Sequence, residues 1–225
     1  ADSEEFNKEF ENDPSQNQFN SFTYEMMLKI IDDIEIEDKD YEANYSNFGI
    51  GVLAVALEKA FRRPFHELLE ELLDELDLKE TFIGFDGCTR ADLEGYSLDG
   101  QLLGNLLWSK DSIIGPAGYL FSTADDMFKY AVSQINDNTG YLHLCHTAQA
   151  VFQPDDNMPY HIGLCWVLVP KFNIIYHNGG TRCFHTIVCI NIEKKTAVTM
   201  LCNYPIEEVS NTAVSLLVEL TKDKA

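Results

Sequence analysis

The sequence predicts an α+β fold in which an antiparallel sheet is flanked by helices. Apolar residues recur at helical spacing through the first two thirds of the chain, and after about residue 158 the pattern changes to extended runs. With 225 residues and 45% hydrophobic content, the chain can bury a sizeable core. We expect one domain with a polar arm at 1–20, a mainly helical part at 21–157, and antiparallel strands with a C-terminal helix at 158–225.

Five amphipathic segments are expected to form helices. Ser21 or Thr23 can cap the first helix, and Asn47 can cap the second. Pro64 suits the first turn of the third, and residues 122–125 resemble a capping box, with Asp in place of the usual Glu, that starts the fourth. The expected helices cover residues 24–34, 48–61, 64–76, 124–135 and 206–222.

The second of these helices is strongly apolar. Its residues Ile50, Leu53, Ala54, Leu57 and Phe61 recur at helical spacing and fall on one stripe. We expect this stripe to face the core.

Extended runs toward the C-terminus predict a set of strands joined by tight turns at 170–171 and 193–195. Residues 81–116 carry turn signals without a sustained period, and a long irregular segment of this kind is more often a functional wall than a linker. The expected strands cover residues 160–169, 173–176, 183–192 and 196–202.

The chain is strongly acidic, with a formal net charge of −21 at pH 7. It therefore repels nucleic acids and anionic lipids, which excludes binding through a basic surface. No apolar run approaches the roughly 20 residues of a membrane helix, and the first residues lack the basic and apolar regions of a signal peptide. Acidic runs at 32–42 and 67–80 are typical of solvated faces, with a site for a basic partner as the alternative.

The cysteines and histidines do not form a metal motif. The six cysteines include no C-x-x-C pair and lie in apolar contexts, so we expect free thiols. His143 and His146 have ligand-capable side chains at close spacing, but no second ligand pair lies at a suitable distance. We expect these two residues to belong to a packed helix, and we predict no metal site.

Three short patterns carry side chains suited to a cleft. Tyr45-Ser46-Asn47 stands before one expected helix, residues 115–123 form a small-residue turn into another, and His177-Asn178-Gly179-Gly180-Thr181 lies between two strands. The alternative for the first pattern is a tyrosine packed on the core and a helix cap. The alternative for the third is an edge-strand histidine bonded to the backbone.

The ordered set resembles the penicillin-recognising serine hydrolases. Tyr-x-Asn before an amphipathic helix, Ser-Thr-Ala-x-Asp-Met after a small-residue turn, and His-x-Gly on a strand follow that family's order and spacing. The group holds class C beta-lactamases, D-alanyl-D-alanine carboxypeptidases and related esterases. The similarity covers about residues 18–222, and 201–205 resembles the class C end. It implies a beta-lactamase/transpeptidase-like fold and no metal or organic cofactor.

The resemblance assigns proton transfer to the Y-x-N motif. Tyr45 matches the tyrosine that moves a proton between nucleophile and leaving group. A free phenol has a pKa near 10, so it would need neighbouring cations to act at neutral pH. Asn47 matches the residue that hydrogen bonds a substrate amide and fixes the lysine of the site.

The resemblance assigns further roles to residues 177–181 and to Asn203. His177 stands where many members have the Lys of K-T-G, and an imidazole near pKa 6.5 would make activity depend on pH. The resemblance implies that Gly179 lets a substrate lie against the strand and that the Gly180 amide is an oxyanion donor. Thr181 would place a hydroxyl near a substrate carboxylate, and Asn203 would contact substrate.

One element of the family is missing. A Ser-x-x-Lys at the start of a buried helix supplies the acylated serine and its lysine partner. No serine of this chain has a lysine three residues later, and the nearest pair is Ser109-Lys110. The family places that motif farther ahead of Y-x-N than the stretch before Tyr45 allows. We therefore expect a C-terminal portion whose N-terminal part is missing through truncation, processing or a companion chain.

The sequence leaves three hypotheses for function. The first is part of a serine hydrolase that cleaves an amide, ester or lactam bond of a small-molecule or peptide-like substrate through an acyl-enzyme. The second is a non-catalytic module that binds peptide-like or cell-wall-like ligands. The third is an acidic interaction protein that uses the helical face with Glu67, Glu70, Glu71 and Asp74.

Overall fold

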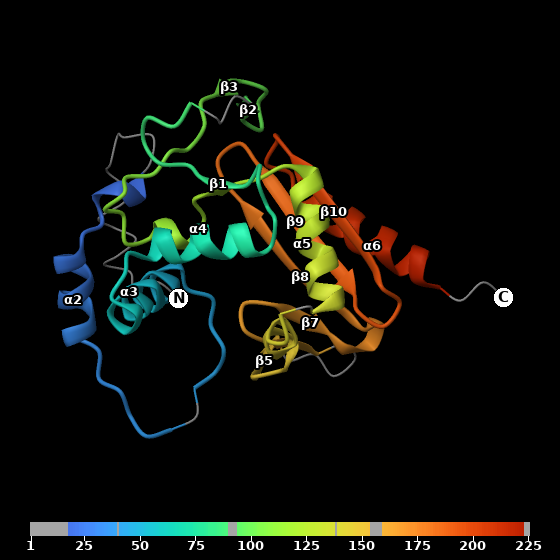
Figure 1. Ribbon diagram of the computed structural model, residues 1–225, viewed down its shortest axis with the longest axis horizontal. Coiled ribbons are helices and arrows are strands. Elements are labelled where there is room, and N and C mark those ends of the chain that lie inside the picture. The colour runs from blue at the N-terminus through green and yellow to red at the C-terminus, as the bar shows by residue number, and fades with distance from the viewer. Residues whose placement is uncertain (1–17, 40, 90–93, 138, 154–158, 223–225) are drawn as a thin grey trace. The chain divides into compact units, whose positions relative to one another are not determined.

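The computed structural model describes residues 18–39, 41–89, 94–137, 139–153 and 159–222, which fall into two compact units (Figure 1). The first unit takes in Ala1–Asp74, Phe82–Asp92 and Leu106–Phe121, and the second takes in Glu75–Thr81, Leu93–Asn105 and Ser122–Ala225. Helices dominate the first, and an antiparallel sheet flanked by helices forms the second. The predicted α+β class is therefore confirmed. Most of the polar arm predicted at 1–20 lies outside the described residues, and its end begins the 3-10 helix η1 (Gln18–Ser21).

Helices α2 (Tyr24–Asp32), α3 (Asn47–Phe61) and α4 (Phe65–Glu75) form most of the first unit. Thr23 caps α2, as predicted, because its hydroxyl accepts a hydrogen bond from the Met26 N–H at 3.3 Å. The predicted cap of α3 is wrong by one position. The Ser46 hydroxyl accepts from the Gly49 N–H at 2.9 Å, and Asn47 is the first helical residue.

The core of the first unit is rich in aromatic residues. The Phe19 ring stacks on Trp108 with centroids 5.8 Å apart, and Phe22 meets Phe48 of α3 edge-on. Two short strands, β1 (Phe82–Ile83) and β4 (Leu120–Phe121), pair antiparallel beside this cluster. The buried members of the cluster are Phe22, Met27, Ile83, Trp108, Ile114 and Tyr119.

The face of α3 that packs on this core differs from the predicted stripe. Ala54 is buried as expected, but Leu53 and Phe61 stay 49% and 62% exposed, so the prediction is wrong for these two residues. The helix is apolar on two sides, and periodicity alone does not select the covered one. The residues that are buried or pack on the core are Phe48, Gly51, Val52, Ala54 and Val55.

In the described residues, the second unit contains a six-stranded antiparallel sheet in the order β10-β9-β8-β7-β6-β5. The strand predicted at 160–169 is divided in two, because the Gly163 N–H donates to the Trp166 carbonyl at 2.8 Å and closes a turn. Strand β5 was not predicted. The strands are β5 (Ala150–Gln153), β6 (Tyr160–Ile162), β7 (Val167–Val169), β8 (Ile174–Gly180), β9 (His185–Asn191) and β10 (Thr196–Cys202).

Each face of this sheet carries one long helix. Residues of β9 alternate between the faces: Ile187 and Cys189 pack with α6 (Glu208–Thr221), whereas Val188 and Ile190 join the cluster of α5 (Ala124–Asn136). Burial on both faces explains the nearly continuous apolar run of this strand. The short helices η3 (Leu142–His146) and η4 (Pro170–Phe172) connect elements of the unit, and η4 forms the turn predicted at 170–171.

The start of α5 holds a buried carboxylate. Thr123, one residue later than the predicted cap, accepts from the Asp126 N–H at 3.3 Å. Asp126 is fully buried, and it accepts from the Glu80 N–H at 2.7 Å and from Lys129 Nζ at 2.9 Å. The Thr81 hydroxyl donates to it at 3.0 Å. The carboxylate therefore joins the segment before β1 to α5.

Helix η2 (Gly115–Ala117) of the first unit corresponds to the small-residue turn predicted at 115–123. No helix among the described residues is long and apolar enough to cross a membrane. All six cysteines are free thiols, with Cys183 and Cys189 buried and Cys165 exposed.

Candidate functional site

The Tyr45-Ser46-Asn47 motif lies in the first unit at the start of α3. Tyr45 is 58% exposed, and the half-buried Asn47 opens the helix. Helix α3 is held closely against the segment before η2, because a Cβ on Gly51 would lie 2.4 Å from the Ile113 carbonyl oxygen. Gly51 is thus required for this packing, and the packing fixes the end of the helix that carries the motif.

The His177–Thr181 motif lies in the second unit at the end of β8. Strand β7 pairs with β8 only from Ile174 to Tyr176, whereas β9 pairs with all of it through Gly180. In the described part of the chain, residues 177–180 therefore have a strand partner on one edge alone. Backbone N–H and C=O groups on such an edge can pair with an extended ligand.

Gly179 and Gly180 are not required by their surroundings in the folded unit. Neither has a positive φ, and a Cβ built on them would come no nearer than 3.4 Å to Thr186 and 3.7 Å to His185. These are ordinary contact distances, so the second unit itself has room for side chains at both positions. The two glycines leave the backbone uncovered at the part of β8 that lacks a second strand partner.

His177, the first residue of this motif, is half-buried. Burial lowers the pKa of its imidazole below the ordinary 6.5, and a hydrogen bond with the Asn178 backbone opposes this only in part. The imidazole is therefore neutral at pH 7. A neutral ring can accept a proton, whereas the lysine of K-T-G would be charged.

Thr181 closes the hairpin that follows β8. Its N–H donates to the Phe184 carbonyl at 2.9 Å, and its hydroxyl accepts from the Phe184 N–H at 3.2 Å. The hydroxyl thus stabilises the turn, and its contact with a substrate carboxylate stays a prediction. The turn sets the end of β8 opposite His185 of β9.

Asn203 lies at the same end of the sheet, one residue after β10. Its side-chain amide donates to the Glu94 carbonyl at 2.8 Å, and its own carbonyl accepts from the Tyr96 N–H at 2.9 Å. These bonds hold the hairpin of β2 (Gly95–Tyr96) and β3 (Leu102–Leu103) against the sheet end. Asn203 therefore has a structural partner, and its predicted contact with substrate is not tested by this geometry.

Sequence reasoning did not identify this hairpin as part of the sheet end. A Cβ on Gly95 would lie 2.6 Å from Cys183, so β2 packs closely on the β8–β9 turn. The Tyr204 hydroxyl also donates to the Leu98 carbonyl. The glycine was the available signal, although a single glycine among several turn residues does not specify a tight contact.

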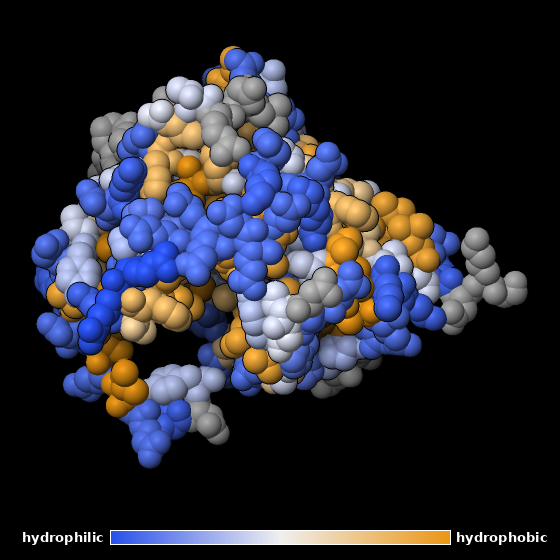
Figure 2. All heavy atoms as spheres, in the orientation of Figure 1, coloured by the Kyte–Doolittle hydropathy of each residue, from blue (hydrophilic) through white to orange (hydrophobic). Residues whose placement is uncertain are grey.

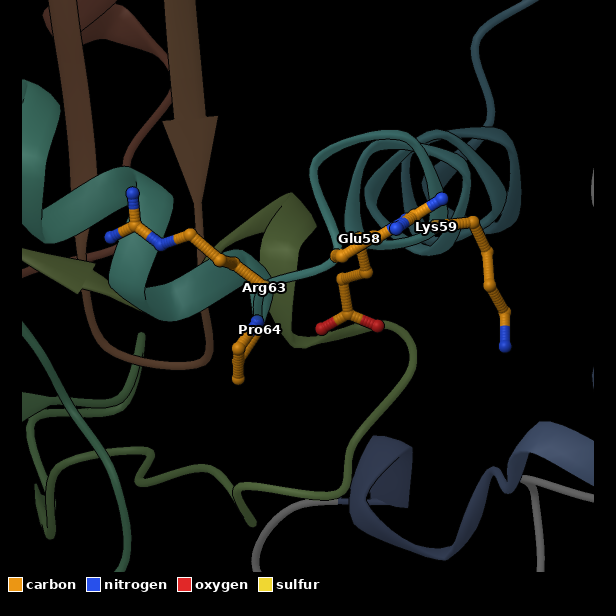
Figure 3. Close-up of a pocket in the computed structure, with 5 residues that line it drawn as sticks. Glu58, Lys59, Arg63 and Pro64 are labelled. Carbon is orange, nitrogen blue, oxygen red and sulfur yellow. The ribbon is translucent and has the colours of Figure 1, made fainter.

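The charged residues at the corner between α3 and α4 do not resemble a functional site. At the corner between α3 and α4, an open hollow is lined by Glu58, Lys59, Arg62, Arg63 and Pro64 (Figure 3). Glu58 accepts there from the Phe65 N–H at 2.8 Å, and Arg63 lies 2.6 Å from the Glu71 carboxylate, so these charges serve the corner itself. Among the residues that the structure describes, no group of three or more potential ligands is arranged to hold a metal ion.

The histidines at 143 and 146 have partners of their own within the second unit. His143 Nδ1 lies 2.5 Å from the Asp137 carboxylate, and His146 Nε2 lies 2.8 Å from the Gln134 side-chain oxygen. They lie on the short 3-10 helix η3, where a packed helix was expected from the sequence.

The fold and motif order agree with a match to the Beta-lactamase family model over residues 3–221. The chain belongs to the beta-lactamase family. No curated protein sequence matches it. A class C beta-lactamase structure covers 91% of the chain at 15% identity with a TM-score of 0.74. The D-alanine carboxypeptidase AmpC from Burkholderia cenocepacia covers 87% of it at 17% identity with a TM-score of 0.71.

The similarity extends to a penicillin-binding protein homologue. The octameric penicillin-binding protein homologue from Pyrococcus abyssi covers 88% of the chain at 20% identity, with a TM-score of 0.68. At such identities the likeness shows the beta-lactamase/transpeptidase-like fold. The chain spans 65% of the length of the class C structure and 48% of the Pyrococcus protein. It therefore corresponds to part of these relatives, in agreement with the predicted C-terminal portion.

Proposed function

We propose that this chain is the C-terminal part of a beta-lactamase-related serine hydrolase that cleaves an amide, ester or lactam bond through an acyl-enzyme. The Ser-x-x-Lys motif would come from sequence outside these 225 residues, because no serine here has a lysine three residues later. The substrate would be a small or peptide-like molecule. The open edge of β8 at residues 177–180 is the observation that carries the proposal.

This edge suits a peptide-like substrate for a physical reason. An extended backbone can add to an unpaired strand edge, and glycines allow it to approach without meeting a side chain. The Gly180 N–H would then donate to the oxyanion formed when a serine attacks the carbonyl carbon. The substrate carbonyl oxygen becomes this anion, and the leaving amine or alkoxide takes up a proton.

Proton movement would depend on Tyr45 and His177. In the proposed reaction, Tyr45 passes the serine proton to the leaving group, and Asn47 hydrogen bonds the substrate amide and the lysine. The lowered pKa of His177 supports a neutral imidazole at pH 7 in place of the lysine of K-T-G.

Acylation by a fluorescent penicillin or a fluorophosphonate probe tests the proposal. We expect labelling of the protein that contains Ser-x-x-Lys, with a heat-denatured sample as background. Gly179→Val should lower the labelling rate about tenfold or more by blocking the strand edge. Glu70→Gln, on the exposed face of α4, is the matched control and should label normally. Background labelling of the motif-containing protein would refute the proposed hydrolase.

The alternative is a non-catalytic module that binds peptide-like or cell-wall-like ligands through the same edge. The lack of Ser-x-x-Lys within these residues favours it. Saturable binding of a D-alanyl peptide without acylation, lost in Gly179→Val, would support this alternative over the hydrolase.

A further inference from the structure

Cys145 and Cys165 lie on two segments of the second unit that contact each other. Cys145 belongs to η3, and its carbonyl oxygen accepts a hydrogen bond from the Leu164 N–H at 3.0 Å. The residue after each cysteine takes part in a second contact, because the His146 ring meets the Trp166 ring edge-on with centroids 5.7 Å apart. The two cysteines therefore stand between two direct contacts of η3 with the turn that joins β6 to β7.

The backbones of these two segments approach closely. A Cβ on Gly163 would lie 2.2 Å from the Cys145 carbonyl oxygen, so the turn can pack here only with a glycine. A disulfide requires Cα atoms no more than about 7 Å apart, and backbones in hydrogen-bond contact can meet this requirement.

The two thiols also share one electrostatic environment. Burial raises the pKa of Cys145, and the nearby Cys165 thiol and Asp137 raise it further. Burial raises the pKa of Cys165 as well. The phenol of Tyr130 is affected in the same way: burial raises its pKa to about 12, and both thiols add to this shift. Both cysteines are therefore protonated at pH 7 and lie near the same aromatic side chain.

The two thiols differ in their access to solvent. Cys165 is exposed, whereas Cys145 is half-buried. Cys165 has a φ of 63° at the third position of the turn Gly163–Trp166, a conformation that favours Gly or Asn in turns. The turn itself therefore does not call for a cysteine. The surface over β5 and η3 includes pale and orange regions, which an uncharged reagent can approach (Figure 2).

We propose that Cys145 and Cys165 form a disulfide that fastens η3 to the β6–β7 turn, with a low-molecular-weight disulfide as the oxidant. The exposed Cys165 thiol gives up its proton and attacks one sulfur of the reagent, whose other sulfur leaves and takes up a proton. Cys145 then gives up its proton and attacks the Cys165 sulfur, and the second reagent sulfur leaves as a thiol. The protein loses two hydrogens, and the reagent disulfide is reduced to two thiols.

This bridge would close a loop that contains β5. Strand β5 lies between the two cysteines in the chain, and it is the last strand of the six-stranded sheet among the described residues, next to β6. A cross-link across this loop restricts the unfolded chain and therefore stabilises the folded unit. The bridge uses no residue of the proposed reaction, so it does not depend on the proposed hydrolase.

Mass spectrometry of the protein expressed from the whole gene tests the bridge. The reduced protein is incubated with hydroxyethyl disulfide, which is uncharged and therefore not repelled by the acidic chain, and remaining thiols are alkylated before digestion without reductant. We expect the peptides with Cys145 and Cys165 to be joined, and lighter by two hydrogens than the separate peptides together. A bridge to another cysteine, reagent adducts without a bridge, or thiols that stay free would each overturn the proposal.

Serine variants show which thiols are needed. Cys165→Ser should give no joined peptides. Cys202→Ser is the matched control, because Cys202 is a half-buried cysteine on β10 of the same unit, and it should form the bridge as wild type does. Loss of the bridge in both variants would contradict the assignment.

Melting curves show whether the bridge fits the folded unit. The oxidised protein should melt at least about 4 °C above the reduced protein, and dithiothreitol should reverse this shift. Cys165→Ser should melt at the same temperature with and without the reagent. A bridge that forms but leaves the melting temperature unchanged, or lowers it, would contradict a disulfide compatible with the fold.

Discussion

Replacing Asp126 with asparagine should destabilise the second unit strongly. Its carboxylate is fully buried and accepts three hydrogen bonds, from the Glu80 N–H at 2.7 Å, the Thr81 hydroxyl at 3.0 Å and Lys129 Nζ at 2.9 Å. An asparagine keeps one acceptor oxygen and directs an NH₂ donor at groups that already donate. The variant therefore loses charge-assisted bonds and leaves a buried donor without an acceptor.

The magnitude follows from the three contacts. The two charge-assisted bonds from the Glu80 N–H and the Thr81 hydroxyl contribute about 1.5 kcal/mol each. The pair with Lys129 adds little, because the lysine side chain is 42% exposed and solvent screens it. The expected loss is about 3 kcal/mol in the free energy of unfolding, or about 6 to 12 °C in melting temperature for a chain of this size.

The pH dependence has a definite sign. Burial by itself raises the pKa of Asp126, but hydrogen bonds from Lys129, Thr81 and Glu80 outweigh it and hold the pKa below the ordinary 3.8. A group with a depressed folded pKa stabilises the fold above its unfolded pKa, and this contribution is lost as pH falls through the folded value. The difference between wild type and Asp126→Asn should therefore be full at pH 7 and shrink below about pH 3.8.

Urea unfolding followed by circular dichroism measures this effect. Asp125→Asn, the exposed neighbour in the first turn of α5, is the matched control and should change the unfolding free energy by less than about 0.5 kcal/mol. A loss of under about 1 kcal/mol for Asp126→Asn, or one equal to that of the control, would refute the argument that buried charge-assisted bonds hold this junction.

Three further measurements test other parts of the structure. Gly51→Val should lower the free energy of unfolding by about 1 to 3 kcal/mol, because its Cβ would lie 2.4 Å from a carbonyl oxygen. Gly49→Ala is the control and should be nearly neutral, because its Cβ would come no nearer than 3.4 Å to another atom. Urea unfolding midpoints of the two variants test this difference. Burial raises the pKa of Asp137, but hydrogen bonds, led by that from His143, outweigh burial and hold the pKa below its ordinary value. Asp137→Ala should therefore be less stable than wild type at pH 7, and the difference should shrink as the pH falls. Melting curves recorded across this pH range measure the difference. The His177 imidazole should titrate below pH 6.5 in an NMR pH series, assigned by the signal lost in His177→Gln, and a midpoint above 6.5 would contradict its burial.

The sheet was the most predictable part of the fold. Extended apolar runs and the tight turn at 193–195 define β9 and β10 closely, because a strand buried on both faces is apolar nearly throughout. Strand β8 continues to Gly180, past the end of the strand predicted at 173–176. Strand β5 escaped prediction because its four residues contain no long apolar run, although a Pro-Asp-Asp-Asn turn signal follows them. Local patterns of this length are compatible with loop or strand, and pairing with β6 decides between them.

Helix caps show the limit of local reasoning. Ser46 and Asn47 are both good caps by residue type, and the choice of Ser46 depends on which residue first adopts helical dihedral angles. Asp126 illustrates a larger gap. Its sequence context indicates an acidic first turn of a surface helix, but a contact with residues 80 and 81, far away in the chain, makes it a buried junction.

The candidate site also combines residues that local sequence patterns identify with roles that such patterns do not determine. The β8 edge could be located only in part, because the strand predicted at 173–176 stops where the residues that lack a β7 partner begin. The roles of Tyr45 and Asn47 depend instead on a serine and a lysine that these residues do not include. Sequence patterns therefore identify the edge and the motif but not the reaction.

Helix α3 carries both a wrongly predicted core face and the start of the candidate site. The stripe with Leu53 and Phe61 was predicted to face the core because its residues are apolar. These two side chains stay exposed because the described residues of the first unit leave them uncovered. The same helix starts at the Y-x-N motif and is fixed by Gly51 against the Ile113 carbonyl. The packing at Gly51 therefore holds the start of α3 in place. In the proposed function, loosening it with Gly51→Val should lower both stability and the rate of acylation, whereas blocking the β8 edge with Gly179→Val should lower the rate of acylation alone.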